Sequence, residues 1–286
     1  MRLATVEIDD TMRTVARTAR GVVRDVTAAT GDCGLAALLP LTQRSALARE
    51  LDLYPEIDIT TARWLPPVPR PEHIVCVGLN FATHAVEVGT KTAAHPTLFT
   101  RFASSFVGHH DPLIRPFVSD TLDWEGELVV VIGDGGRHIA AEHAMAHVAG
   151  YSLMGENSVR EFQLHSGQAT AGKNFDASGS WGPWMITIDE IDDPDALEII
   201  TTVNGHRYQH GRAADLCFDA AQIIAYVSSF TTLQPGDVLA LGTPPGIGHR
   251  QEPPRYLRDG DELVITIPGV MDLINTVRDE NQEPTS

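Results

Sequence analysis

Long apolar runs are missing from this 286-residue sequence. Its most apolar segments, such as residues 128–132, have the length of a buried strand, whereas a membrane-spanning helix needs about 20 apolar residues. Residues 1–10 turn acidic too early for a secretory signal peptide. We therefore expect no membrane partner and a cytoplasmic location.

Cysteines and basic residues are both scarce. The three cysteines, Cys33, Cys76 and Cys217, form no C-x-x-C pair, which argues against a disulfide framework and predicts reduced thiols. The chain has 21 Lys and Arg against 38 Asp and Glu, a formal net charge of −17. Such a chain repels phosphate backbones, so we expect no nucleic-acid partner. An anionic substrate would need a local cation, either a metal ion, a Lys or an Arg.

One change of composition divides the chain. Residues 63–72 read RWLPPVPRPE, and their prolines disfavour helix and favour an extended linker. We predict a small N-terminal domain over residues 1–65, a Pro-rich linker over 66–72 and a catalytic domain over 73–286. Within the first of these, two segments have strand patterns and one a helix pattern: residues 2–8, 21–27 and 41–51.

Strand patterns outnumber helix patterns after the linker. Short apolar runs bounded by turn residues predict strands at residues 73–78, 127–132, 184–188, 198–203, 238–241 and 262–267. Helices are predicted at residues 140–147, 159–164 and 219–230. Because the two kinds of element do not alternate regularly, the sequence predicts a strand-dominated α+β fold rather than a doubly wound βαβ sheet.

The run DWEGELVVVI carries the strongest local signal. On a strand, Glu125 and Glu127 point to the same face, because side chains alternate with period two. Apolar residues then follow on both faces, which predicts a buried strand whose two carboxylates repel each other. A hard cation such as Mg²⁺ or Ca²⁺ would relieve that repulsion. An exposed strand end would also do so, and the spacing alone leaves both interpretations open.

A third carboxylate, Glu156, favours the metal interpretation. Ser158 and Glu161 have the spacing of a capping box, so a helix is predicted to begin at Ser158. Glu156 would then lie just before a helix N-terminus, where an anion is favoured. Considered alone, Glu156 is more simply interpreted as an acid on a surface loop.

Three other residues could take part in proton transfer or charge stabilisation. His84 and Glu87 lie three residues apart and share a face on a helical turn, where the carboxylate would make the imidazole a better base. Lys173 follows Gly172 in a turn that could direct its ammonium into a cleft. A surface His–Glu pair and a solvated lysine are the simpler interpretations of these residues.

Residues 241–248 read LGTPPGIG, a Gly-rich loop after a predicted strand. The loop lacks the G-K-[ST] ending of a nucleotide-binding P-loop. It could still present the backbone of Gly242 and the hydroxyl of Thr243 to a carboxylate. A purely structural turn explains the loop equally well.

Taken in order, these motifs resemble the fumarylacetoacetate hydrolase family. The resemblance rests on VGLNFATHAVE, DWEGELVVVIG, GY-x₅-NSVREFQ, AGKNFD, VNGHRYQ and LQPGDVLALGTPPGIG, between about residues 73 and 277. It implies a mixed β-roll catalytic domain, a homodimer and a bound Mg²⁺ or Mn²⁺. It also implies roles for particular residues: Glu125, Glu127 and Glu156 as metal ligands, His84 and Glu87 as base dyad, Lys173 as catalytic lysine, and Gln163, Gly242 and Thr243 at the substrate.

The resemblance implies chemistry on a small 2-oxo acid. Our first hypothesis is metal-dependent hydrolysis of a carbon–carbon bond in a 2,4-dioxo acid, an acylpyruvate, that gives pyruvate and a second carboxylic acid. The alternative is decarboxylation or tautomerisation of a 2-oxo diacid, such as oxaloacetate or a 2-hydroxydienedioate, at the same site. A third hypothesis, a metal-binding scaffold without catalysis, does not account for the presence of His84, Glu87 and Lys173 together.

Overall fold

The computed structural model describes residues 1–82 and 93–281, and strands dominate this part of the chain. The longest sheet places three long strands at its centre, paired antiparallel in the order β13, β11 and β10. Its full order is β3 (Val23–Asp25), β2 (Thr11–Arg17), β1 (Arg2–Ile8), β13 (Gly179–Thr187), β11 (Val148–Gly155), β10 (Gly126–Ile132), β16 (Val238–Ala240), β5 (Ile74–Gly78) and β6 (Thr97–Thr100). Two short strands join off this path: β4 (Arg63–Leu65) on β1 and β7 (Phe106–Val107) on β13.

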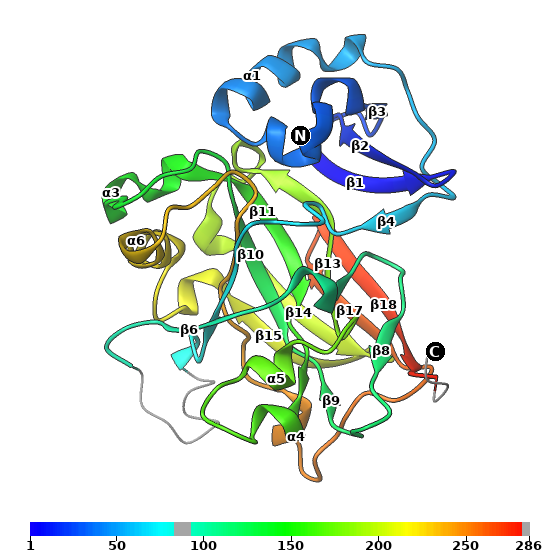
Figure 1. The fold of residues 1–286 in the computed structure, drawn as a ribbon, viewed down its shortest axis with the longest axis vertical. Helices are drawn as coiled ribbons and strands as arrows, with labels where there is room; N and C mark the ends of the chain where they lie inside the picture. The colour runs from blue at the N-terminus through cyan, green and yellow to red at the C-terminus, as the bar shows by residue number, and fades with distance from the viewer. Residues whose placement is uncertain (83–92, 282–286) are drawn as a thin grey trace.

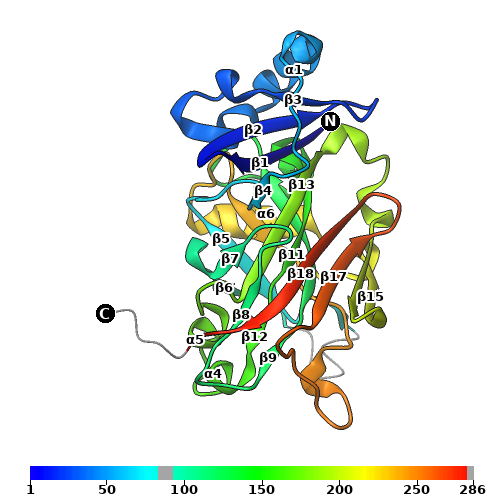
Figure 2. The ribbon, with the colours of Figure 1, turned by 90° about the vertical axis from the view of Figure 1, so that its right-hand side faces the viewer.

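A second sheet packs against one face of the first. Its order is β15 (His206–Arg212), β14 (Glu198–Val203), β17 (Glu262–Ile267), β18 (Met271–Asp279) and β8 (Leu113–Arg115). Figure 2 shows β17 and β18 crossing in front of the central strands, and β18 contacts β13 while β17 contacts β11. A separate ribbon pairs β9 (Leu122–Asp123) with β12 (Ser158–Val159).

The helices are short and lie at the periphery of the sheets (Figure 1). Helix α1 (Leu41–Glu50) lies with the N-terminal strands, and α3 (Ala141–Ala144) packs against α6 (Ala220–Phe230). Near β9, α4 (Arg160–Gln163) contacts α5 (Thr170–Lys173). Among the described residues, no helix combines the length and the apolar character needed to cross a bilayer.

Strand β10 separates two apolar cores, which explains why its sequence is apolar on both faces. Leu128 and Val130 belong to the core shared with the second sheet and α6. Val129 and Val131 belong to the core on the opposite face, together with Leu3 and Leu35 of the N-terminal part. All residues of β10 are buried, as its apolar residues on both faces predict.

The strand-dominated α+β fold class predicted from the sequence is confirmed, and most of the predicted elements are present. The long strands β11 and β18 were missed, because glycines weaken the strand pattern of the first and charged residues that of the second. The N-terminal part also joins the main sheet, since Arg2 pairs with Ile186 and Leu3 with Met185 across β1 and β13. The domain boundaries at residues 65 and 73 stay predictions.

Candidate active site and metal centre

Three carboxylates meet at the joined ends of β10 and β11. Glu125 directly precedes β10, Glu127 is its second residue, and Glu156 directly follows β11. Gly126 pairs with Gly155 in the antiparallel ladder, which brings the two strand ends together. One carboxylate oxygen from each glutamate lies within 4.8 Å of the others. Their exposed fractions are only 6%, 2% and 0%, so the exposed-strand-end and surface-loop interpretations are both wrong.

Lys173, the last residue of α5, joins two of these carboxylates. Its Nζ lies 3.0 Å from Oε1 of Glu125 and 3.0 Å from the backbone oxygen of Glu156, and it also donates to Oε2 of Glu156. Gly172 makes this placement possible, because a Cβ there would lie 2.4 Å from the backbone nitrogen of Gln163 in α4. Only 2% of Lys173 is exposed, so the solvated-lysine interpretation is wrong.

Arg160 is a site residue that the sequence reasoning missed. Its Nη1 lies 2.8 Å from Oε1 of Glu125, and its Nε donates to Asp123 at 2.8 Å. The Nη2 of Arg160 is buried and has no hydrogen-bond partner among the residues that the structure describes. Arg160 lies within the recognised motif NSVREFQ, but spacing gave no sign that it reaches back to Glu125, 35 positions earlier.

The predicted helix start at Ser158 is wrong by two residues. Ser158 belongs to β12, and α4 begins at Arg160. The hydroxyl of Ser158 donates to Oε1 of Glu125 at 2.6 Å instead of capping a helix. A capping-box pattern records only local spacing, and here a buried carboxylate was the stronger partner for the hydroxyl.

The electrostatic balance differs among the three glutamates. Burial opposes the ionisation of Glu125, but Arg160 and Lys173 outweigh it and hold its pKa at about 2. Burial and the adjacent carboxylates of Glu156 and Glu125 raise the pKa of Glu127 well above its ordinary range. Burial also raises the pKa of Glu156, although Lys173 and Arg101 oppose this. An additional positive charge is therefore favourable at this site.

A divalent cation fits this donor set. All three side chains offer oxygen ligands, which hard cations such as Mg²⁺, Mn²⁺ and Ca²⁺ prefer. Among the residues that the structure describes, the Glu127 carboxylate accepts one hydrogen bond, from the backbone N–H of Gly242 at 2.8 Å, and forms no ion pair with Lys or Arg. Glu125, Glu127 and Glu156 are the residues that would hold the ion.

A cavity of about 340 Å³ opens beside Glu125 and Lys173. Its lining combines polar and basic side chains with apolar ones: Arg160, Gln163, His249, Phe99, Leu79 and Leu164. The amide oxygen of Gln163 accepts a hydrogen bond from Arg160 at 2.8 Å, which orients the amide toward the cavity wall. The volume suits a small organic acid, and the lining offers donors for its oxygens.

The Gly-rich loop forms hydrogen bonds with the first two residues of β10, at the carboxylate site. Besides the contact of Gly242 with Glu127, the hydroxyl of Thr243 donates to the backbone oxygen of Gly126 and accepts from the Gln209 amide, at 2.9 and 2.8 Å. Only 3% of Thr243 is exposed. The expected contacts of Gly242, Thr243 and Gln163 with a substrate stay predictions. His84 and Glu87, the predicted base dyad, lie outside the described residues.

Comparisons with known proteins identify a single family. The family model "Fumarylacetoacetate (FAA) hydrolase C-terminal" matches residues 73–278. The chain is 42% identical over 235 residues to a mitochondrial oxaloacetate tautomerase of Rattus norvegicus. The aligned region covers 82% of this chain and 74% of that protein.

Two solved structures match nearly the whole chain. Fumarylacetoacetate hydrolase from Exiguobacterium antarcticum is 34% identical with a TM-score of 0.83, over 98% of this chain and 100% of that one. Maleylpyruvate hydrolase from Sphingobium sp. SYK-6, in complex with manganese(II) and pyruvate, is 28% identical with a TM-score of 0.82, again over 98% and 100%.

Proposed function

The chain belongs to the fumarylacetoacetate hydrolase family, and from this we propose that it stabilises the enolate form of a small 2-oxo acid. The observation that carries the proposal is the buried cluster of three carboxylates joined to Lys173. A cation held by Glu125, Glu127 and Glu156 would supply Lewis-acid chemistry to the substrate's carboxylate and 2-oxo group.

Lys173 would provide the second positive charge. Burial opposes its protonation, but Glu125 and Glu156 outweigh that effect and raise its pKa, so the ammonium stays charged at neutral pH. In a buried site, a fixed ammonium stabilises negative charge that develops on a substrate oxygen. The Nη2 of Arg160, which has no partner in the described part of the chain, could donate to another oxygen of the same substrate.

Tautomerisation of an oxaloacetate-type 2-oxo diacid is the reaction that we now place first. A proton leaves C3, the electrons of that C–H bond move toward the 2-oxygen, and a proton is added there; the reverse sequence restores the ketone. No carbon–carbon bond breaks. The 42% identity to an oxaloacetate tautomerase supports this order, which reverses the order favoured by the sequence alone.

Hydrolysis of an acylpyruvate is the second candidate, supported by the similarity to maleylpyruvate hydrolase. His84, oriented by Glu87, would take a proton from water, and the resulting hydroxide would add to the 4-oxo carbon. The bond between C3 and C4 then breaks, and pyruvate leaves as its enolate. This reaction depends on the predicted dyad to activate water, whereas tautomerisation needs a base for C3 only.

Product analysis separates the candidates. The purified protein is incubated with Mg²⁺ or Mn²⁺, with and without a chelator, and supplied with enol-oxaloacetate, acetylpyruvate or fumarylpyruvate. Chelator-sensitive loss of the enol signal without CO₂ or pyruvate would support the tautomerase. Pyruvate and a second acid from an acylpyruvate would support the hydrolase, and CO₂ from oxaloacetate the decarboxylase.

A pair of variants tests the metal ligands. Glu127→Gln keeps the shape of a buried ligand and removes its charge, so we expect metal binding and turnover to fall at least tenfold. Glu262→Gln makes the same change on the exposed start of β17 and should alter neither. Normal metal binding by the first variant would exclude Glu127 as a ligand. The predicted homodimer and cytoplasmic location are tested by light scattering and by cell fractionation.

A further inference from the structure

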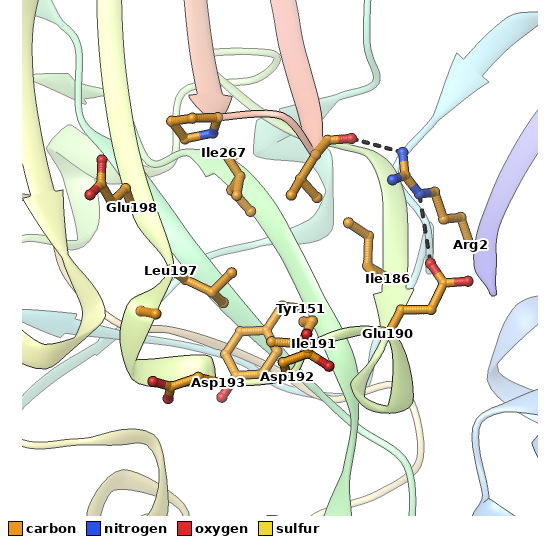
Figure 3. A pocket seen from close by; sticks show the side chains of 13 residues that line it. Arg2, Tyr151, Ile186, Glu190, Ile191, Asp192, Asp193, Leu197, Glu198 and Ile267 are labelled. Atoms are coloured by element: carbon orange, nitrogen blue, oxygen red, sulfur yellow. Dashed lines mark hydrogen bonds and ion pairs between the residues drawn. The ribbon is translucent and has the colours of Figure 1, made fainter. Parts of the chain in front are cut away.

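A second cavity, of about 410 Å³, lies apart from the carboxylate site and shares none of its described lining residues with the cavity there. Figure 3 shows its lining residues, with Arg2 on one side and Glu198 and Asp193 on the other. Tyr151 of β11 and Ile186 of β13 form one side, and Ile267 at the end of β17 another. The chain that follows β13 closes the remaining side with Ile191 and Leu197.

Tyr151 is an unusual residue for such a position. Only 2% of it is exposed, yet its hydroxyl forms no hydrogen bond with any residue in the described part of the chain. The hydroxyl is not itself fully buried, because Tyr151 lines the cavity, so a ligand bound there could form a hydrogen bond with it. The phenol also borders an adjoining hollow of about 260 Å³ with Asp195 and Asp219. Burial and these two carboxylates raise the pKa of Tyr151, so its hydroxyl stays neutral.

The charges around the cavity are mainly negative, and the cation there is already paired. Arg2 donates to the backbone oxygen of Val270 at 2.7 Å and lies 3.8 Å from Glu190. Asp192 and Asp193 are exposed at the rim, on the side of the Tyr151 ring (Figure 3). Among the described residues, Asp192 has no hydrogen-bond or ion-pair partner. An anionic ligand is therefore disfavoured, in agreement with the net charge of −17.

We propose that this cavity binds a small organic cation, with an apolar body the size of a phenyl ring and a primary ammonium group. The aliphatic walls would enclose the body. The ammonium would donate to the oxygen of Tyr151 and lie within the field of Asp192 and Asp193. Such a site combines an apolar pocket with a few converging polar groups, as small-molecule sites usually do. It is independent of the reaction at Glu125, Glu127 and Glu156.

Three probes of similar shape and different charge test the proposal: 2-phenylethylamine, 2-phenylethanol and 3-phenylpropionate. Binding to the full chain is measured by calorimetry and by ligand-observed NMR. We expect the amine to bind, the alcohol to bind at least fivefold more weakly, and the carboxylate not to bind. Added salt should weaken binding of the amine, since rim carboxylates contribute to it.

Conservative variants locate the binding site. Tyr151→Phe keeps the ring and removes the hydroxyl, so it should weaken binding of the amine about fivefold. Asp192→Asn should weaken it about twofold and reduce the salt dependence. Glu262→Gln, which removes one exposed carboxylate at the far end of β17, should change neither. Thermal unfolding of each variant shows whether the fold is retained.

Three results would overturn the proposal. The first is equal binding of all three probes, because charge would then play no part. The second is unchanged affinity for the amine in a folded Tyr151→Phe variant. The third is no binding of the amine at millimolar concentration. In that case the oligomeric state of the Leu197→Glu variant is measured. Dissociation of an oligomer by this substitution would show that a second copy of the chain covers the cavity.

Discussion

At the scale of the residue, neighbouring carboxylates in one site have different partners. Glu125 contacts both Arg160 and Lys173, whereas Glu127, two residues further on, is held by the N–H of Gly242. Spacing in the sequence predicts that the two side chains share a face, but it cannot predict which of them receives a cation. That difference matters for the chemistry, because Lys173 is held by Glu125 and Glu156 beside the cavity, where it can reach a substrate.

Replacing Lys173 should separate catalysis from metal binding. In Lys173→Met we expect turnover to fall about 100-fold or more, since a charge that stabilises the transition state is lost. The metal should bind at least as tightly as before, because Glu125 and Glu156 lose a competing cation. Steady-state kinetics at saturating metal and calorimetric titration measure the two effects.

Arg101 offers a matched control for Lys173. It pairs with Glu156 at 3.2 Å but does not line the cavity beside Glu125. Arg101→Met should therefore lower stability, while turnover at saturating metal changes only a few-fold. Equal losses of turnover in the two variants would contradict a direct role for the Lys173 ammonium.

At the scale of the element, the contact between α4 and α5 fixes the position of Lys173. Gly172→Ala would place a methyl group against the backbone of Gln163, so α5 must shift. We expect a loss of stability of about 1–3 kcal/mol and a fall in turnover of about 10- to 100-fold. Gly167→Ala has open space at its Cβ and should leave stability unchanged. Denaturant unfolding compares the two; equal stability would contradict the prediction.

A second prediction at this scale concerns the contact between the β7–β8 loop and β18. Nδ1 of His109 accepts a hydrogen bond from the backbone N–H of Ile274 at 3.0 Å. Burial and the adjacent His110 lower the pKa of His109 to about 4, below the value of about 6.5 expected for an unfolded chain. The unfolded chain thus binds more protons between these values, so this contribution to stability is present above pH 6.5 and is lost as pH falls toward 4.

The variant His109→Asn tests this linkage. Asn offers an acceptor oxygen near the position of Nδ1 but does not titrate. We expect the free energy of unfolding of the wild-type protein to fall more steeply between pH 6.5 and 4 than that of the variant. Urea unfolding across this range measures the difference. Parallel pH profiles would show that His109 does not contribute.

At the scale of the whole molecule, residues 1–65 complete the structure of the main sheet. They cover the face that carries Val129, Met154 and Met185, and β1 pairs with the edge of β13. A fragment of residues 66–286 would expose this apolar face and the unpaired strand edge. We expect that fragment to aggregate or unfold, as judged by circular dichroism and light scattering. A folded, active fragment would instead support the predicted independent N-terminal domain.

The sequence by itself determined the features that depend on neighbouring residues. The apolar residues on both faces after Gly126 predict β10 and its burial, and the order of the motifs predicts the family, now confirmed. The two faces of a strand are defined within a few positions, and so is each single motif, whereas the order of the motifs extends along most of the chain. The spacing of Glu125 and Glu127 and the family resemblance likewise predict Glu125, Glu127 and Glu156 as candidate ligands.

Only the tertiary structure decided which distant groups meet. It paired Arg160 with Glu125 and turned Ser158 away from the predicted helix cap. It also left the hydroxyl of Tyr151 at a cavity, without a hydrogen-bond partner among the described residues. These contacts depend on how strands from separate parts of the chain pair and pack. A buried polar group takes whichever partner the fold brings within reach, and local spacing does not contain that information.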